Sequence, residues 1–84
     1  MAACMSMEAT EMLLDLKGLN CPLPALRTAR ALRRMPPGAM LVVECTDPMA
    51  AIDVPHCAFE NGSTLEGRSS EEGVLTFRIR RGAP

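Results

Sequence analysis

The chain has 84 residues, of which 48% are hydrophobic, 23% are charged and only two, Phe59 and Phe77, are aromatic. A chain this short forms one domain without a large cofactor pocket, and without Trp or Tyr it lacks the aromatic platform on which single-stranded bases stack. Nine Lys and Arg against ten Asp and Glu give a net charge of −1, which argues against a general attraction to DNA or to anionic membranes.

The first ten residues, MAACMSMEAT, carry no hydrophobic period. We expect residues 1–10 to form a flexible arm ahead of a single domain at 11–82. Apolar runs such as 39–43 are far shorter than the roughly 20 residues of a membrane helix, and the arm lacks the positive start and apolar stretch of a secretory signal. We therefore expect a cytoplasmic protein without membrane insertion or direct nucleic-acid binding, whose cysteines are thiols, metal ligands or a redox pair before they are structural disulfides.

The first half of the chain predicts a strand, a helix and a second strand. The leucine-rich segment 13–16 predicts the first strand, which turn-forming residues close. Residues 25–35 are nearly all good helix formers and predict a helix. Its first turn tolerates Pro22 and Pro24, because the N–H groups that they lack would have no helical partner. The short apolar run Met40–Cys45, which is rich in Val and contains one charged residue, Glu44, predicts a central strand.

The second half begins with a helix signal. Asp47 is typical of a helix cap, and Pro48 would then take the first helical position. Asp53-Val54-Pro55 repeats the helix-start signal and therefore predicts one short turn and a break at Pro55. A helix follows from about 54 to 60, and Asn61-Gly62 stops it in the left-handed conformation.

A hairpin ends the chain. Residues 63–68 predict a weak strand, 69–73 a polar turn and 74–80 a strand with strict alternation. One face of that last strand carries Leu75, Phe77 and Ile79, and the other carries Thr76, Arg78 and Arg80. The order βαβαββ therefore predicts an α/β (α+β) two-layer sandwich, with a mixed four-stranded sheet, two helices on one face and water on the other.

Cys21 is the most informative position for chemistry. It lies at the start of the first helix, where unpaired N–H groups and the positive end of the helix dipole would stabilise a thiolate and lower the thiol pKa. The prolines after it restrict the backbone. The alternative is a small buried side chain, but a place between Asn20 and Pro22 ahead of a helix is unfavourable for burial. We interpret Cys21 as a reactive surface thiol.

The helix behind Cys21 contains four arginines and no acid. Three of them share one face at helical spacing, namely Arg27, Arg30 and Arg34, whereas Leu26, Ala29 and Leu32 are expected to turn towards the sheet. Such a face can attract an acidic partner or an RNA backbone and help to hold a thiolate. The alternative is an ordinary solvated helix face, which the absence of acids makes less convincing.

The other cysteines and the single histidine are not expected to form a second metal or catalytic site. Cys45 at a strand end and Cys57 inside a short helix are expected to be packing residues, and Cys4 lies in the arm. A metal site built from Cys45, His56 and Cys57 lacks an obvious fourth ligand, so we expect no metal and no cofactor. A cysteine hydrolase would depend on His56 alone, without an oxyanion-loop signature beside it.

Segment 14–24, LDLKGLNCPLP, resembles the signature of the TusA-like (SirA-like) sulfur carrier family, in which a strand and a Gly-containing turn lead into Cys-Pro-x-Pro. Further motifs fall where that family has them, at Pro37-Gly38, 46–48, 53–55 and the final strand 75–79. The resemblance covers about residues 12–81. It implies a two-layer sandwich of βαβαββ order.

The same resemblance implies that Cys21 accepts a sulfane sulfur, carries it as a persulfide and passes it on. Pro22 and Pro24 would shape the site, and Asp47 carries over as a motif residue. The implied partners are a cysteine desulfurase or another persulfide donor and a downstream sulfur-acceptor protein. Members of the family serve tRNA thiolation, molybdenum-cofactor supply, sulfur oxidation or sulfur transport.

Two functions follow from these observations. The first is a sulfurtransferase-type carrier that needs neither metal nor nucleotide, with Arg27, Arg30 and Arg34 in partner recognition. The alternative is a non-catalytic redox-sensing or regulatory module whose arginine face binds protein or RNA. A sensor often has a resolving thiol nearby, and we expect neither Cys45 nor Cys57 to lie close enough to resolve Cys21.

Overall fold

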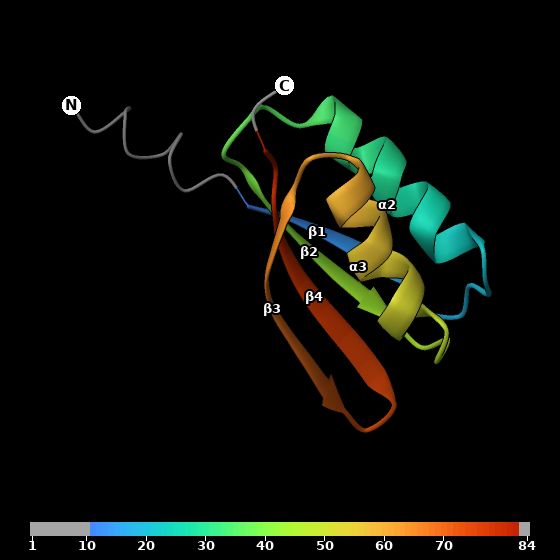
Figure 1. Ribbon diagram of the computed structural model, residues 1–84. Coiled ribbons are helices and arrows are strands. Elements are labelled where there is room, and N and C mark those ends of the chain that lie inside the picture. Colours follow the sequence, from blue (N-terminus) through green and yellow to red (C-terminus); the bar gives the residue numbers. More distant parts are fainter. Residues whose placement is uncertain (1–10, 83–84) are drawn as a thin grey trace.

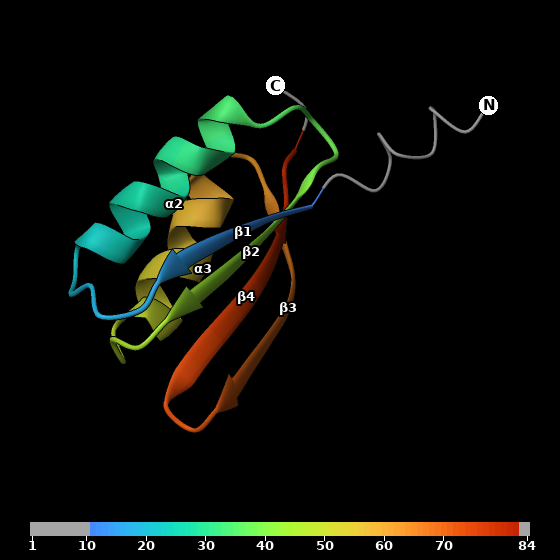
Figure 2. The same cartoon turned by 180° about the vertical axis from the view of Figure 1, so that it is seen from behind.

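Two helices lie on one face of a four-stranded sheet in the computed structural model, which describes residues 11–82 (Figures 1 and 2). The elements in chain order are β1 (Glu11–Leu16), α2 (Leu23–Arg34), β2 (Met40–Cys45), α3 (Ala50–Glu60), β3 (Thr64–Glu71) and β4 (Val74–Arg80). The predicted βαβαββ order, the mixed sheet and the one-sided helix layer are confirmed. The expected arm at 1–10, with Cys4, lies outside the described residues.

The sheet order is β1-β2-β4-β3. Strands β1 and β2 are parallel and joined by α2, whereas β4 runs antiparallel to both of its neighbours. Leu16 lies opposite Cys45 in the β1–β2 register, so these two strands end at the same edge of the sheet. The loop after β1 and the segment after β2 therefore leave the sheet side by side, and this placement builds the site described below.

The core lies between the sheet and the two helices. The sheet contributes fully buried side chains, which are Leu16, Leu41, Val43, Phe77 and Ile79. Alternation along β4 is confirmed, because Phe77 and Ile79 are buried whereas Arg78 and Arg80 are exposed. Each large apolar side chain removed from water contributes about 1.5–3 kcal/mol to folding.

The buried face of α2 differs from the predicted one. Pro24, Thr28 and Leu32 are buried at intervals of four residues. Leu26 is 59% exposed, so the expectation that it faces the sheet is wrong. A residue two positions away from the buried row is rotated by about 200° around the helix axis, and therefore points to solvent.

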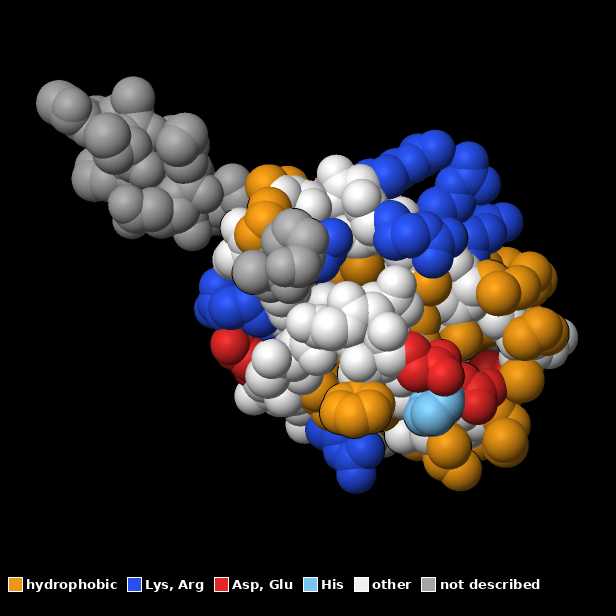
Figure 3. Space-filling view, turned by 45° about the horizontal axis from the view of Figure 1, so that its top comes forward, with side chains coloured by type: hydrophobic (Ala, Val, Ile, Leu, Met, Phe, Trp, Pro, Cys, Tyr) orange, Lys and Arg blue, Asp and Glu red, His pale blue; other side chains and the backbone are white. Residues whose placement is uncertain are grey.

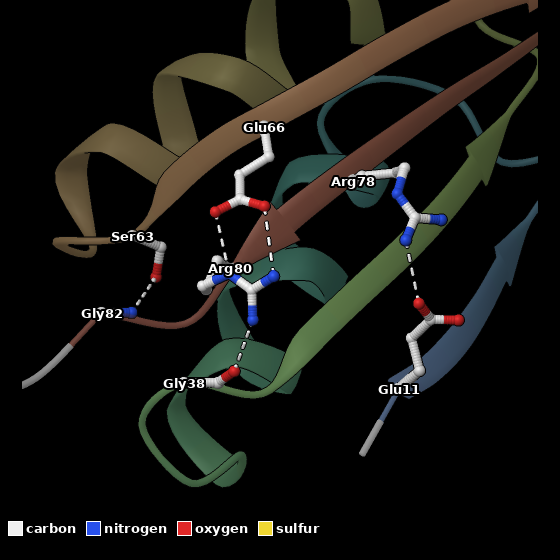
Figure 4. A network of polar contacts seen from close by, with 7 residues as sticks. All are labelled: Glu11, Gly38, Ser63, Glu66, Arg78, Arg80 and Gly82. Carbon is white, nitrogen blue, oxygen red and sulfur yellow. Dashed lines mark hydrogen bonds and ion pairs between the residues drawn. The ribbon is translucent and has the colours of Figure 1, made fainter. Parts of the chain in front are cut away.

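Ion pairs cover the face of the sheet that carries no helix (Figure 4). Arg78 reaches Glu11 with 2.9 Å between Nη2 and Oε2, and Arg80 pairs with both carboxylate oxygens of Glu66 at 2.8 and 3.2 Å. Arg80 also donates to the carbonyl of Gly38 at 2.9 Å. Exposed pairs of this kind contribute little to stability, but they keep the open face polar.

Helix α3 is continuous, so the predicted break at Pro55 is wrong. Pro55 lies inside the helix, where its ring removes one backbone hydrogen bond. Buried residues before and after the proline, Val54 and Ala58, are held against the core. This packing on both sides of Pro55 outweighs the single lost bond.

The start of α3 also differs in detail. Pro48 lies in a turn before the helix, which begins at Ala50, and the Asp47 carboxylate accepts the Met49 N–H at 3.0 Å within that turn. Asp47 therefore caps the turn rather than the helix. The predicted stop is confirmed: Gly62 has a φ of 71°, and the Ser63 N–H bonds the Ala58 carbonyl at 2.9 Å.

Strand β3 is longer than predicted and the turn after it is shorter. Residues 69–71 pair with β4 instead of forming a polar turn, and the connection consists of Glu72 and Gly73, both with positive φ. As an edge strand with exposed side chains, β3 accepts polar residues that a central strand would exclude. No helix in the described range 11–82 is long and apolar enough to cross a membrane.

Candidate functional site

Cys21 lies on the surface, in the loop between β1 and α2. The Leu23 N–H bonds the Asn20 carbonyl at 2.8 Å, and the Leu26 N–H bonds the Pro22 carbonyl at 3.1 Å. These two bonds place Cys21 in a tight turn that leads directly into the first turn of α2. The predicted exposure of the thiol at the helix start is confirmed.

Contacts with the segment after β2 hold this loop in place. The Gly18 N–H donates to Thr46 Oγ1 at 2.9 Å, and the Cys21 N–H donates to Asp47 Oδ2. Lys17 pairs with Glu44 on β2 at 2.9 Å. Asp47 therefore supports the backbone of Cys21 directly. This tertiary contact goes beyond the helix-cap role that the sequence predicts for Asp47.

The thiol itself contacts a second carboxylate. Cys21 Sγ donates to Asp53 Oδ2 at 3.0 Å, across 32 positions of sequence. Asp53 lies in the first turn of α3. Sequence reasoning missed this residue, because it used the Asp53-Val54-Pro55 segment as a helix signal and a family motif and assigned no contact to the Asp53 side chain. A continuous helix from Ala50 is what brings the carboxylate to the sulfur.

These carboxylates reverse the expected electrostatics of the thiol. The hydrogen bond to Asp53 raises the Cys21 pKa above its ordinary value, and some desolvation of the sulfur and the negative charges of Asp53 and Asp47 act in the same direction. The prediction of a lowered pKa is wrong, since it considered the start of the helix and the arginines of α2 but not the carboxylates of Asp53 and Asp47.

The two prolines after Cys21 occupy different environments. Pro22 is exposed and directly follows the sulfur-bearing residue, whereas Pro24 is fully buried in the first turn of α2. Thr28, also buried, donates its hydroxyl to the Pro24 carbonyl at 2.7 Å. Pro24 thus anchors the beginning of α2 in the core and, with it, the turn that presents Cys21.

The arginines of α2 border a groove beside the edge strand β1. The groove has a volume of about 420 Å³ and is lined by Arg27, Arg30 and Arg34 together with Met12, Leu14 and Ala31. Figure 3 shows basic side chains gathered over α2. Within residues 11–82 these three arginines form no ion pair, whereas Arg78 and Arg80 do. The groove combines an apolar floor with a cationic wall.

The other two cysteines of residues 11–82 face the interior. Cys45 is fully buried, and burial raises its pKa to about 11. Cys57 lies between the helices, where its sulfur contacts the Ala25 carbonyl at 3.2 Å and burial raises its pKa. His56 is exposed and pairs with Glu60 at 3.1 Å. No group of three metal-ligating side chains occurs among residues 11–82.

The chain is similar to known proteins over most of its length. A family model described as Sulfurtransferase TusA matches residues 12–81. Sulfur carrier protein TusA of Allochromatium vinosum is 40% identical over 68 residues, which are 81% of this chain and 90% of that protein. Sulfur carrier protein TusA of Pseudomonas aeruginosa strain PAO1 is 33% identical over 75 residues, 89% of this chain and 95% of the relative.

The fold has a counterpart among solved structures. The crystal structure of a SirA-like protein from Desulfitobacterium hafniense superposes with a TM-score of 0.73 at 23% identity, covering 86% of this chain and 99% of that one. At this level of identity the likeness concerns the fold alone. It is the same arrangement of two helices on a mixed sheet.

Proposed function

Since the chain belongs to the TusA sulfurtransferase family, we propose that it is a sulfur carrier in which Cys21 accepts a sulfane sulfur as a persulfide and delivers it to an acceptor protein. One observation carries the assignment of the site: among the cysteines of residues 11–82, Cys21 is exposed whereas Cys45 and Cys57 are buried. We propose the cytoplasm as the compartment, because thiols persist there in reduced form.

The transfer needs little from the carrier beyond an accessible sulfur. The deprotonated Cys21 sulfur attacks the outer sulfur of a donor persulfide, a new S–S bond forms, and the S–S bond of the donor breaks. The donor cysteine leaves as a thiolate and takes up a proton, so no external oxidant or reductant takes part. In the second transfer the outer sulfur of the Cys21 persulfide is attacked in turn by a thiolate of the acceptor.

The surface around Cys21 suits repeated docking with partner proteins. Apolar side chains are exposed on both helices and on the turn before α3, the elements that contact the Cys21 loop: Leu23, Leu26, Met49 and Ile52. Such side chains exclude water when a partner covers them. We propose a cysteine desulfurase or another persulfide donor as the first partner, and a downstream carrier or thiolation protein as the second.

The arginine face is proposed to recognise those partners. Arg27, Arg30 and Arg34 lie on the same helix as the Cys21 turn, and their charge is not neutralised by ion pairs within residues 11–82. An acidic partner surface would be attracted to them, which increases the association rate more than the final affinity. Pro22 and Pro24 would keep the sulfur in a fixed direction during docking.

The experiment that tests this function is sulfur loading by a purified cysteine desulfurase with sulfur-labelled cysteine. Wild-type protein should retain label that a reductant releases. Cys21→Ser should retain none, and the matched control Cys57→Ser should load like wild type. Equal labelling of Cys21→Ser and wild type would show that Cys21 is not the carrier residue.

The groove beside β1 favours a second candidate function, a regulatory module that binds a protein or RNA through its arginines. In that case Cys21→Ser should bind its partner normally, whereas combined replacement of Arg27, Arg30 and Arg34 by Gln should abolish binding. A pull-down that compares both variants with wild type distinguishes the two functions. Binding that is indifferent to the arginines would eliminate the regulatory module.

A further inference from the structure

The contact between Cys21 and Asp53 joins the loop before α2 to the first turn of α3, and backbone contacts hold both segments in place. Val54, the residue after Asp53, is fully buried, and the Asp53 N–H bonds the Met49 carbonyl at 2.9 Å. On the other side, Asp47 holds the Cys21 N–H with one carboxylate oxygen and the Met49 N–H with the other. These backbone contacts and the burial of Val54 therefore bring Asp53 Oδ2 to 3.0 Å from Cys21 Sγ.

The charges that act on the sulfur have one sign. Asp53 on α3 and Asp47 in the turn before it are the charged groups that raise the Cys21 pKa. The nearby basic side chain of the loop, Lys17, is engaged with Asp15 and Glu44. Because only the thiolate is an effective nucleophile, a thiol bonded to a carboxylate is slow to react with sulfur electrophiles.

This arrangement is unexpected for a residue that must attack a persulfide. A nucleophile that worked alone would be expected beside a cation, which stabilises the thiolate. Here the cations of α2 line the groove with β1, and the carboxylate of Asp53 contacts the sulfur. Among residues 11–82 the charged groups that shift the Cys21 pKa are both acidic, so a cation that favours the thiolate can be supplied by a docked partner.

We propose that Asp53 is a positioning residue that holds Cys21 as an aimed, protonated thiol in the free carrier and releases it when a cationic side chain of the sulfur donor pairs with the Asp53 carboxylate. The proposal rests on the proposed carrier function and deepens it, because it assigns a chemistry to the donor: a lysine or arginine beside its persulfide. A donor without such a cation would load this carrier slowly.

The transfer of sulfur from the donor to Cys21 conserves atoms and charge. The donor cation takes over the Asp53 carboxylate, which removes the hydrogen bond and the negative charge that favour the thiol. The Cys21 proton passes to solvent, and the thiolate attacks the outer sulfur of the donor. One S–S bond forms and one breaks, and the departing donor thiolate takes a proton from solvent. Until the donor docks, the thiol is protected from oxidation and alkylation.

The first test measures the rate of Cys21 alkylation by iodoacetamide as a function of pH, in a Cys4→Ser background. Asp53→Asn should move the midpoint of the profile to lower pH and increase the rate at neutral pH, about tenfold for each unit of the shift. Glu60→Gln, which neutralises a carboxylate at the other end of α3, should keep the wild-type profile. An unchanged or higher midpoint for Asp53→Asn would overturn the proposal.

A second measurement needs no variant at Asp53. The Cys21 carbon resonances of the Cys4→Ser protein, followed by NMR against pH, should titrate above the ordinary thiol value of 9.0. A midpoint below that value contradicts the proposal even if Asp53→Asn fails to fold. Neither alkylation nor titration uses a sulfur donor, so both can succeed or fail independently of the carrier function.

The role of the donor cation is tested by comparing two donors. Glutathione persulfide, a small donor that cannot reproduce the docked surface, should load Asp53→Asn faster than wild type. A cysteine desulfurase should load Asp53→Asn more slowly than wild type, because its cation has lost a partner. Faster loading of Asp53→Asn by both donors would refute the assignment of a cation to the donor.

Discussion

At Cys21, local helix geometry and tertiary charge act in opposite directions. The start of a helix favours a negative charge by about 0.3–1 kcal/mol at an exposed position. The carboxylate of Asp53 accepts a hydrogen bond from the sulfur at 3.0 Å and opposes ionisation, with Asp47 adding to its effect. The position and exposure of Cys21 could be predicted from the sequence, whereas its protonation could not, because Asp53 is 32 residues away in the chain.

Asp47 provides a prediction at the same scale. Its carboxylate accepts the N–H groups of Cys21 and Met49, and thereby joins the Cys21 loop to the turn before α3. Asp47→Ala leaves both donors without this acceptor and should lower the free energy of unfolding by about 1–2 kcal/mol. Urea denaturation measures the change.

Asp47→Asn is the matched control, because the amide oxygen can still accept one of the two bonds. It should therefore lose less stability than Asp47→Ala. If Asp47→Ala unfolds at the wild-type urea concentration, the carboxylate does not hold the loop.

The elements that sequence analysis predicted correctly are those with a strong local pattern. Strand β2 is an apolar run, and β4 alternates between buried and exposed side chains, so both could be bounded from the sequence. The errors occur where tertiary contacts override local preference. Pro55 remains inside α3 because buried residues flank it, and residues 69–71 extend β3 because β4 provides their hydrogen-bond partners.

The β3–β4 hairpin carries a testable prediction at the scale of elements. Its two-residue turn has Glu72 at a φ of 51° and Gly73 at 81°. A left-handed conformation is costly for Glu, whereas Asn adopts it readily and Asn-Gly is the preferred pair in this kind of turn. Glu72→Asn should raise the free energy of unfolding by about 0.5–1 kcal/mol, measured by thermal or urea denaturation.

Glu72→Val is the informative comparison, because a β-branched residue tolerates positive φ poorly and should destabilise the hairpin. Neither substitution touches the helices or the Cys21 turn. A destabilising Glu72→Asn would mean that the turn does not have the described conformation.

Across the whole molecule, topology explains how so small a protein presents a defined sulfur. The parallel pair β1 and β2 ends at one edge of the sheet, which brings the Cys21 loop against Asp47. Helix α3 then crosses towards β3 and supplies Asp53. The family resemblance placed motifs on all three of these segments. Only the packed fold shows that the segments meet around the thiol.

The two outward-facing features of the molecule have separate proposed tasks. We propose that the exposed thiol carries the sulfur and that the groove with Arg27, Arg30 and Arg34 provides charge for recognition. The shared face of these arginines could be predicted from helical spacing. The groove could not, because Met12 and Leu14 come from a strand that the sequence does not place beside α2.

The most direct measurement of the central claim locates the transferred sulfur on the chain. After incubation with a cysteine desulfurase and cysteine, the protein is alkylated without reductant, digested with trypsin and analysed by mass spectrometry. Peptide 18–27, which contains Cys21, should carry one additional sulfur, and peptide 35–68, which contains Cys45 and Cys57, should carry none. An additional sulfur on peptide 35–68 with none on peptide 18–27 would contradict the assignment of Cys21 as the sulfur carrier.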